Sequence, residues 1–357
     1  MGGQKTVFVG LSGGVDSSVA ALRLKKQGYL VVGVFIKVWQ PDFIDCAWEA
    51  ERLDAMRVAA HLDIPFLTCD AVEAYKKEVA DYFVFEYKNG RTPNPDVMCN
   101  KAVKFGAFYN LAMSKGADFV ATGHYAQIDK TGQNLFLKRG IDTNKDQSYF
   151  LWTLRKEQLK NILLPVGSST KDMIRAEAVE ANIPVATKKD SQGICFLGHI
   201  DIPEFLTHFM ELKTGAVLDE NGNKIGTHKG AAVYTTGQRH GFTVDEQSSA
   251  RPVYYVTSRN METNTITVSP NKPLPKVGMK IKLENINILV ENLNLIETIS
   301  IQTRYRQKPC LAIIEAIDLA TSTLTLNPSS AIEIITAGQS CVLYRDDVCL
   351  GGGIIAS

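Results

Sequence analysis

Hydrophobic and polar residues follow two alternating patterns over the first third of the chain. Short apolar runs, typical of buried strands, are separated by longer stretches with helical spacing. The expected strands are residues 7–10, 30–38, 64–69 and 119–122. The expected helices are residues 17–27, 46–62, 71–88 and 101–115. This βαβ alternation predicts an α/β fold with a doubly wound parallel sheet, in which ligands bind at the carboxyl ends of the strands. Ile36 and residues 122–124 end such strands, so they should face one crevice.

The pattern changes after a further expected strand at residues 135–138. Three stretches are expected to be helical: residues 147–159, 171–182 and 202–211. From Thr214 onward the chain has short β-rich runs, and residues 219–223 have the composition of a hairpin turn. A proline-rich linker is expected at 270–275, and residues 280–356 are typical of a small β-barrel. We therefore expect a catalytic α/β domain at 1–200, a small central β-rich domain at 201–270 and a C-terminal β-barrel domain at 271–357.

The loop after the first expected strand reads Ser12-Gly13-Gly14-Val15-Asp16-Ser17 and leads into a helix. Glycines let a ligand approach the backbone, and the N–H groups and dipole of a helix N-terminus favour an anion. The loop therefore predicts a phosphate site. It lacks the lysine of a Walker loop and the three-glycine spacing of a dinucleotide fingerprint.

A hydrolase is the competing interpretation of this loop. Gly10, Ser12 and Gly14 also match a nucleophile elbow, for which His124 could be the later histidine. An elbow needs an earlier strand and loop for its oxyanion hole, and only nine residues precede Gly10. We expect no room for that hole, so the phosphate loop is favoured.

Bulk composition narrows the class of protein but not its partner. The chain has 357 residues, 45% of them hydrophobic and 22% charged, with a net charge of +1, which is ordinary for a globular protein and neutral on nucleic acid binding. No apolar stretch has the length of a membrane span, so we expect no membrane association. The seven cysteines include no C-x-x-C pair, which argues against zinc and iron–sulfur sites and favours a reducing, cytoplasmic location.

Two cysteine segments are candidates for chemistry. Pro93 and Pro95 predict a rigid extended loop that carries Asp96 and Cys99; the alternative is a tight turn before a helix capped by Asn100. Cys195 follows Lys188, Lys189 and Asp190, so its thiol could lie in an electropositive, reactive site. Taken alone, a buried thiol between Ile194 and Phe196 is the more common outcome.

Two polar segments are more ambiguous. Residues 145–150 read as a charged turn that opens a helix, with Tyr149 and Phe150 in the core. Arg304-Tyr305-Arg306 could grip phosphate and stack on a base, although an exposed strand face is the commoner outcome for such a triplet.

Together these segments resemble the tRNA-specific 2-thiouridylases, a bacterial family of the N-type ATP pyrophosphatases. The likeness spans nearly the whole chain and consists of the glycine loop, Asn94-Pro95-Asp96 with Cys99, Ala121-Thr122-Gly123-His124-Tyr125, Lys145-Asp146-Gln147-Ser148-Tyr149, Gly193-Ile194-Cys195-Phe196 and Gly351-Gly352-Gly353-Ile354. The loop is shared by many pyrophosphatases, whereas the cysteine segments are far more specific. The resemblance implies ATP-dependent thiolation of the wobble uridine in the tRNAs for Lys, Glu and Gln, with adenylation of the C2 oxygen.

The resemblance also implies residue roles. Cys195 would carry a persulfide, Cys99 would be its nucleophilic partner in a transient disulfide, and Asp96 would act as an acid or base or orient the base. The implied ATP site is Gly10, Leu11, Ser12, Gly13, Gly14, Val15, Asp16, Ser17, Ile36 and Gly123, with Mg²⁺ near Asp16. The implied contacts with the target base are Asn94, Pro95 and Asp96. The implied tRNA contacts are His124, Lys145, Asp146, Gln147, Arg304, Tyr305 and Gln339.

The implied partners are tRNA and a protein of a sulfur relay or a cysteine desulfurase, with the chain itself monomeric. Two alternatives stay open at this point. One is another AMP-forming pyrophosphatase, a synthetase or amidotransferase that acts on a small molecule. The other is a nucleotide-binding module without enzymatic activity. Neither would need two reactive cysteines.

Overall fold

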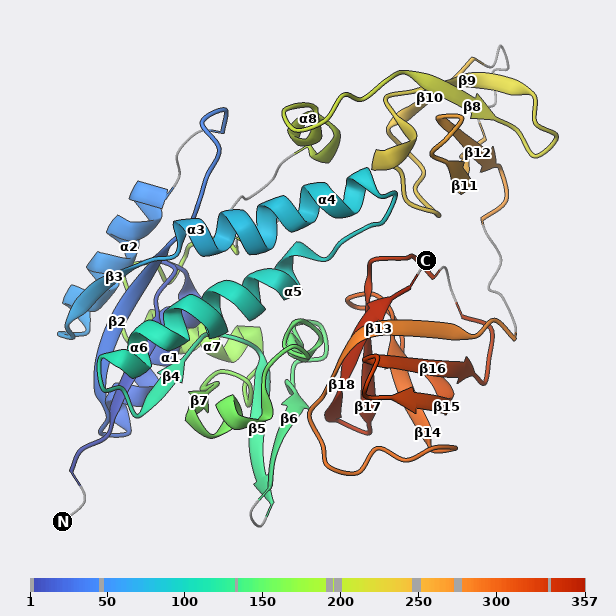
Figure 1. Ribbon diagram of the computed structural model, residues 1–357. Helices are drawn as coiled ribbons and strands as arrows, with labels where there is room; N and C mark the ends of the chain where they lie inside the picture. Colours follow the sequence, from blue (N-terminus) through green and yellow to red (C-terminus); the bar gives the residue numbers. More distant parts are fainter. Residues whose placement is uncertain are drawn as a thin grey trace.

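A five-stranded parallel sheet forms the centre of the N-terminal part of the chain (Figure 1). The computed structural model describes residues 3–44, 48–131, 134–190, 195, 201–245, 252–272, 278–332 and 335–356. The sheet has the order β3-β2-β1-β4-β7, and each neighbouring pair is parallel. Its strands are β1 (Thr6–Gly10), β2 (Leu30–Lys37), β3 (Phe66–Asp70), β4 (Phe119–Ala121) and β7 (Ile162–Leu163). The predicted doubly wound parallel sheet is confirmed.

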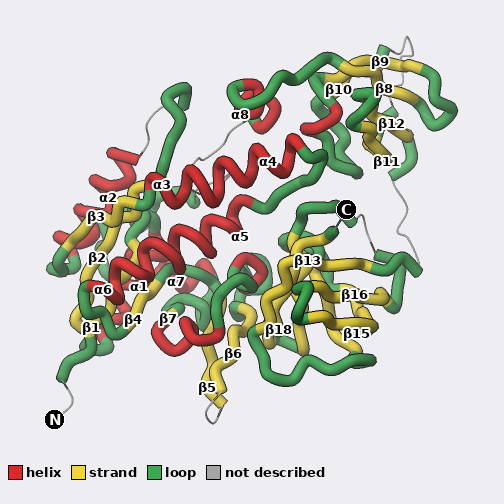
Figure 2. The backbone as a smooth tube through the Cα atoms, in the orientation of Figure 1, coloured by secondary structure: helices red, strands yellow, loops and turns green. Residues whose placement is uncertain are grey.

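Helices cover both faces of this sheet because side chains alternate along the strands. Val7 and Val9 of β1 pack in one core with α1 (Val15–Lys26), α2 (Trp48–His61) and α7 (Lys171–Glu180). Phe8 packs in a second core on the opposite face. Two long helical stretches lie side by side over that face (Figures 1 and 2). They are α3 (Val72–Tyr75), a π-helical segment (Lys76–Asp81) and α4 (Tyr82–Lys88), then α5 (Pro95–Cys99), a second π-helical segment (Asn100–Phe108) and α6 (Tyr109–Ser114).

The second long helix begins six residues earlier than expected, so both interpretations of the proline segment were wrong. Asn94 is the N-cap, and its side chain accepts a hydrogen bond from the N–H of Val97 at 3.3 Å. Pro95 occupies the first helical position, where its missing N–H costs nothing. Asn100 lies inside the helix and donates to the carbonyl of Asp96 at 3.0 Å. Asp96 and Cys99 are therefore carried by a helix and not by a loop.

The helix expected at 147–159 is also wrong. The segment holds two short 3₁₀ turns, Ser148–Phe150 and Lys156–Asn161. Leu151, Trp152 and Leu154 are all buried there, in a core shared with the barrel. Side chains buried in succession cannot share one face of a helix, so the segment stays irregular. The helix expected at residues 202–211 is shorter in the structure, where α8 spans Ile202–Thr207. For the helix expected at residues 46–62, the predicted start at Cys46 lies outside the described residues.

A mixed sheet follows α8, in the order β10-β9-β8-β12-β11. Its strands are β8 (Gly215–Leu218), β9 (Lys224–His228), β10 (Phe242–Val244), β11 (Tyr255–Asn260) and β12 (Thr265–Ser269). The predicted hairpin between β8 and β9 is confirmed, and the Asp219 carboxylate accepts hydrogen bonds from the backbone of its turn. The core of this sheet includes Phe83 and Tyr87 of α4.

Six antiparallel strands close into the predicted C-terminal barrel, because β13 pairs with both β16 and β18. They are β13 (Ile281–Ile288), β14 (Thr298–Gln302), β15 (Cys310–Asp318), β16 (Thr323–Pro328), β17 (Ser340–Arg345) and β18 (Val348–Ile355). The hairpin of β5 (Ala126–Thr131) and β6 (Asn134–Arg139) extends the barrel sheet through a pair between Lys138 and Val348. Within the described ranges, no helix is long and apolar enough to cross a membrane.

Candidate active site

The glycine loop connects β1 to α1 at the carboxyl end of the sheet, as predicted. Gly13 has a φ of +71°, and a Cβ there would lie 2.5 Å from the carbonyl oxygen of Glu51, so this position requires glycine. Ser17 holds the loop, because its hydroxyl accepts from the N–H of Ser12 at 3.3 Å and donates to the carbonyl of Gly14 at 3.1 Å. The loop therefore presents a fixed backbone at a helix N-terminus, which suits phosphate.

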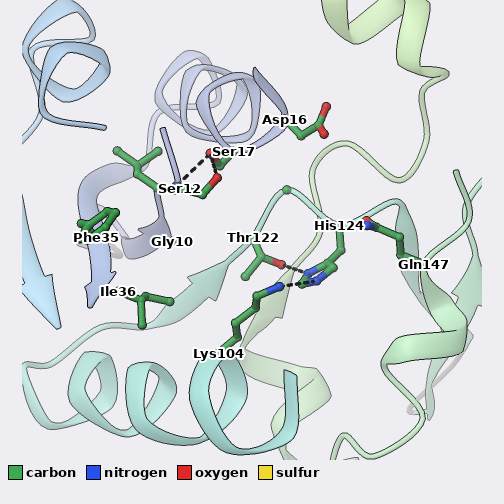
Figure 3. Close-up of a pocket in the computed structure, with 12 residues that line it drawn as sticks. Gly10, Ser12, Asp16, Ser17, Phe35, Ile36, Lys104, Thr122, His124 and Gln147 are labelled. Carbon is green, nitrogen blue, oxygen red and sulfur yellow. Dashed lines mark hydrogen bonds between the residues drawn. The ribbon is translucent and has the colours of Figure 1, made fainter. Parts of the chain in front are cut away.

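A pocket opens beside this loop (Figure 3). It is lined by Gly10, Leu11, Ser12, Asp16, Ser17, Phe35, Ile36, Lys104, Thr122, Gly123, His124 and Gln147. The expectation that Ile36 and residues 122–124 share a crevice with the loop is confirmed. Gly123 packs directly on the loop, since a Cβ there would lie 2.6 Å from the nitrogen of Ser17.

Asp16 anchors a network of charges at the edge of the pocket. Its Oδ1 accepts a hydrogen bond from the hydroxyl of Tyr125 and another from the ammonium of Lys171, each at 2.7 Å. Lys171 also contacts Asp190 at 2.8 Å, and Asp190 pairs with Lys145 at 2.6 Å. Burial opposes ionisation of Asp190, but Lys145 and Lys171 lower its pKa to about 2. The residue pattern assigned no site role to Tyr125, Lys171 or Asp190, because their contacts with Asp16 and Lys145 join residues far apart in the chain.

The structure brings the two predicted cysteines together. The thiol of Cys99 donates to the sulfur of Cys195, with a distance of 3.5 Å between the Sγ atoms. Two groups hold the backbone of Cys195 in place: its N–H donates to Oδ1 of Asp96 at 3.0 Å, and its carbonyl accepts from the hydroxyl of Tyr75 at 3.0 Å. Gly193, Ile194 and Phe196 of the predicted motif lie outside the described residues.

The two thiols differ in acidity. Burial raises the pKa of Cys99 well above the usual thiol value. The hydrogen bond from Cys99 and the positive charge of Lys104 lower the pKa of Cys195, although burial opposes them. Burial also raises the pKa of the Asp96 carboxyl. Cys195 is therefore the thiol that ionises first, and Cys99 stays protonated beside it.

Lys104 is a cation that acts on the sulfur pair, and the residue pattern assigned no role to it. Lys188, which was expected to make the site electropositive, pairs instead with Asp54 at 2.8 Å. The signal for Lys104 becomes visible once the helix is known to begin at Pro95, because Asp96 and Lys104 are then two turns apart on one face.

The residues predicted to contact tRNA have varied environments. Gln147 accepts a hydrogen bond from the N–H of Tyr125, and Asp146 is buried and accepts from Arg139 at 2.8 Å. His124 is buried and lines the pocket, hydrogen-bonded to the hydroxyl of Thr122 at 2.7 Å. Their contacts with tRNA, like that of Lys145, stay predictions.

The barrel supplies the remaining predicted tRNA contacts. Gln339 donates to the carbonyls of Thr92 and Pro93, at 2.9 and 3.0 Å, and so joins the barrel to the segment before Asn94. Arg304 and Tyr305 lie in the loop after β14 and not on a strand face, and they line a separate pocket. Tyr305 packs against Phe150, with ring centroids 4.5 Å apart. The tRNA contacts of Gln339, Arg304 and Tyr305 also stay predictions.

The fold and the site together define a class of protein. A parallel sheet with a glycine loop at the end of β1 and a pocket beside it is the architecture of a pyrophosphate-loop ATPase, here with a cysteine pair whose Cys99 lies on the same helix as Lys104 of the pocket. Three protein-family models match the chain: a tRNA methyl transferase HUP domain at residues 5–199, a tRNA methyl transferase PRC-barrel domain at 203–270 and an aminomethyltransferase beta-barrel domain at 279–355.

Full-length relatives identify the family. A tRNA-specific 2-thiouridylase of Staphylococcus carnosus is 40% identical over 354 residues, which cover 98% of this chain and 94% of the relative. One from Colwellia psychrerythraea is 41% identical over 359 residues, with 99% and 96% covered. The chain belongs to the tRNA-specific 2-thiouridylase family. A solved 4-thiouridine synthetase–RNA complex with bound ATP is 22% identical over 57% of this chain and 50% of that chain, with a TM-score of 0.34, too weak a likeness to support an argument.

Proposed function

We propose that this protein uses ATP to replace the C2 oxygen of the wobble uridine with sulfur in the tRNAs for Lys, Glu and Gln. The observation that carries the proposal is the 3.5 Å distance between the sulfurs of Cys99 and Cys195, with Cys99 on the same continuous helix as Lys104 of the nucleotide pocket. A pocket for phosphate explains activation of an oxygen, and a thiol pair explains its replacement by sulfur.

The glycine loop serves the activation step. The C2 oxygen of uridine is a poor leaving group, and attack of this oxygen on the α-phosphate of ATP would release pyrophosphate and attach AMP. The N-terminus of α1, which follows the glycine loop, favours the negative charge that develops at the phosphates, and so stabilises this transition state. Mg²⁺ binds one or two carboxylates together with phosphate oxygens, and Asp16, partly exposed at the pocket, suits that role. When bound, Mg²⁺ would neutralise phosphate charge.

The cysteines serve the sulfur step. The terminal sulfur of a Cys195 persulfide attacks C2, and AMP leaves with the electron pair of the C2–O bond. Cys99 then passes its proton to a base such as Asp96, and its sulfur attacks the Sγ of Cys195; the S–S bond breaks, and its electron pair stays on the sulfur bonded to C2. The product is a thiocarbonyl, and the Cys99–Cys195 disulfide needs an external thiol for reduction. In the alternative order, Cys99 attacks first and releases hydrosulfide, which then attacks C2.

Asn94, Pro95 and Asp96 are proposed to contact the target base at the N-terminus of α5, one helical turn before Cys99. Asp96 acts as an acid or base, or orients the base. We further propose a sulfur-relay protein or cysteine desulfurase as donor, a monomeric state, a cytoplasmic location, and chemistry without zinc or an iron–sulfur cluster. The matching family models carry the words methyl transferase, but two adjacent thiols near a phosphate pocket favour sulfur transfer.

The test replaces each cysteine in turn. We expect Cys99→Ser and Cys195→Ser to abolish tRNA thiolation, scored as retardation on a mercury gel, while release of pyrophosphate from ATP with tRNA persists. Cys310→Ser is the matched control, because Cys310 lies half-buried in the barrel, where its thiol is hydrogen-bonded to the hydroxyl of Ser330. Full sulfur transfer by either variant would overturn the two-cysteine mechanism, and ADP as product would overturn the role of the loop.

A further inference from the structure

The helix that carries Cys99 also places a lysine in the nucleotide pocket. Lys104 extends from the π-helical segment Asn100–Phe108 into the pocket, where its ammonium donates to Nε2 of His124 at 3.3 Å (Figure 3). Lys104 follows Cys99 by five residues, the spacing of one π-helical turn, so both side chains leave the same face of this helix, and the positive charge of Lys104 acts on the sulfur of Cys195. A π-helical segment is itself uncommon and is often found at functional sites. Here it belongs to the same continuous helix as Asp96 and Cys99.

The neighbours of Lys104 keep it a fixed cation. Burial alone would lower the pKa of its ammonium, but the two sulfurs and the Asp96 carboxyl raise it above its usual value. His124 cannot share the charge, because burial and the charge of Lys104 hold its pKa well below the usual value. An ammonium only donates, so Nε2 of His124 accepts and its Nδ1–H donates to the hydroxyl of Thr122 at 2.7 Å. This series of hydrogen bonds, from Thr122 through His124, orients Lys104 from the end of β4.

Among the described residues, the other groups packed around Cys195 do not replace this charge. Cys99 and Asp96 on α5 supply a neutral thiol and a carboxyl, and Tyr75 on α3 contacts the backbone carbonyl of Cys195. Burial raises the pKa of the Tyr75 phenol, so it stays neutral. The hydrogen bond from Cys99 favours an anionic sulfur, and Lys104 adds the positive charge that offsets burial.

We propose that Lys104 is a further catalytic residue of this site: the positive charge of its ammonium holds the sulfur of Cys195 as an anion, ready to accept sulfur. The inference rests on the proposed function and deepens it. In the loading step, the Cys195 thiolate attacks the terminal sulfur of a donor persulfide. A new S–S bond forms at Cys195, the donor's S–S bond breaks, and the donor leaves as a thiolate that takes up a proton. Lys104 then faces the loaded persulfide, which is also anionic.

The experiment measures the pH dependence of alkylation of Cys195 by iodoacetamide in the full chain, with peptide mass spectrometry to separate Cys195 from Cys99. Wild-type Cys195 should react with a midpoint below the ordinary thiol value of 9.0. Lys104→Met should move this midpoint upward by about one unit or more, with roughly tenfold slower alkylation near neutral pH. Lys104→Arg keeps the charge and should stay near wild type. Lys101→Met is the matched control, since Lys101 is exposed on the same helical segment.

An unchanged midpoint in Lys104→Met, or a wild-type midpoint at or above 9.0, would overturn the proposal. The wild-type and Lys104→Arg profiles decide the matter even if Lys104→Met fails to fold. Alkylation needs neither tRNA nor ATP, so this result is independent of thiolation. A shifted midpoint in a protein that thiolates no tRNA would support the role of Lys104 and contradict the proposed function.

Discussion

The hydrogen bond from the N–H of Cys195 to the Asp96 carboxylate controls how the two cysteines meet, and Asp96→Ala removes it. The donor–acceptor distance is 3.0 Å, and the group is shielded enough for burial to raise the pKa of Asp96. A hydrogen bond of this kind contributes about 1–3 kcal/mol to the arrangement that it holds. Because about 1.4 kcal/mol is a factor of ten, its loss should lower the effective concentration of one thiol at the other by roughly 5- to 150-fold.

The assay is formation of the Cys99–Cys195 disulfide in glutathione buffers of graded redox ratio, quantified by mass spectrometry. We expect Asp96→Ala to need a more oxidising buffer by that factor. Asp96→Asn is the matched control, because its amide oxygen still accepts the N–H of Cys195. If Asp96→Ala forms the disulfide as readily as wild type, the reasoning about this hydrogen bond is refuted. Thiolation by Asp96→Asn then separates the two roles: near-normal activity indicates orientation of the base, and a loss of about 10²–10⁴-fold indicates proton transfer.

Two further predictions concern the phosphate loop and the charge network. Gly123→Ala places a Cβ 2.6 Å from the nitrogen of Ser17, and such overpacking costs about 1–3 kcal/mol, so we expect a lower unfolding temperature and a higher KM for ATP. Gly3→Ala is the control, because a Cβ at Gly3 meets no atom within 4 Å and should change neither quantity. A Gly123→Ala enzyme with unaltered stability and KM would contradict the close packing. The pKa of Asp190 is about 2 in the fold against the usual 3.8, so its stabilising contribution is present above 3.8 and is lost as pH falls toward 2. Asp190→Asn should lower the unfolding temperature at neutral pH, because it weakens the ion pair with Lys171. It should also make the unfolding temperature fall less steeply than in wild type as pH drops from 3.8 toward 2. If the unfolding temperature of the variant and the wild type changes equally over this range, the contribution of Asp190 is disproved.

The sequence was sufficient for the parallel sheet, the glycine loop and the closed barrel, because each depends on local periodicity or on a local motif. It failed where tertiary packing overrides local pattern. Residues 147–159 are apolar enough for a helix, but the barrel buries Leu151, Trp152 and Leu154 from several directions. The two prolines predict a loop around Pro95, although a proline after a capping Asn94 also begins a helix.

The candidate site was predictable only in part for the same reason. The sequence pointed to Cys99 and Cys195, but their 3.5 Å approach joins residues 96 positions apart. The partners of Asp16 are equally remote, since Lys171 lies 155 positions away. Lys104 shares a helix with Cys99 only because that helix begins at Pro95. Charged residues carry no periodic signal for such contacts, so these groups became visible only in three dimensions.

The central claim is that this chain exchanges the C2 oxygen of a tRNA uridine for sulfur at the expense of ATP. Mass spectrometry of nucleosides from unmodified tRNA, incubated with the enzyme, ATP and a low-molecular-weight persulfide as sulfur donor, tests it most directly. The account predicts 2-thiouridine at the wobble position of the tRNAs for Lys, Glu and Gln, together with AMP and pyrophosphate, and no product when ATP is omitted. Uridine left unchanged by an enzyme that binds ATP and keeps both cysteines reduced would contradict it.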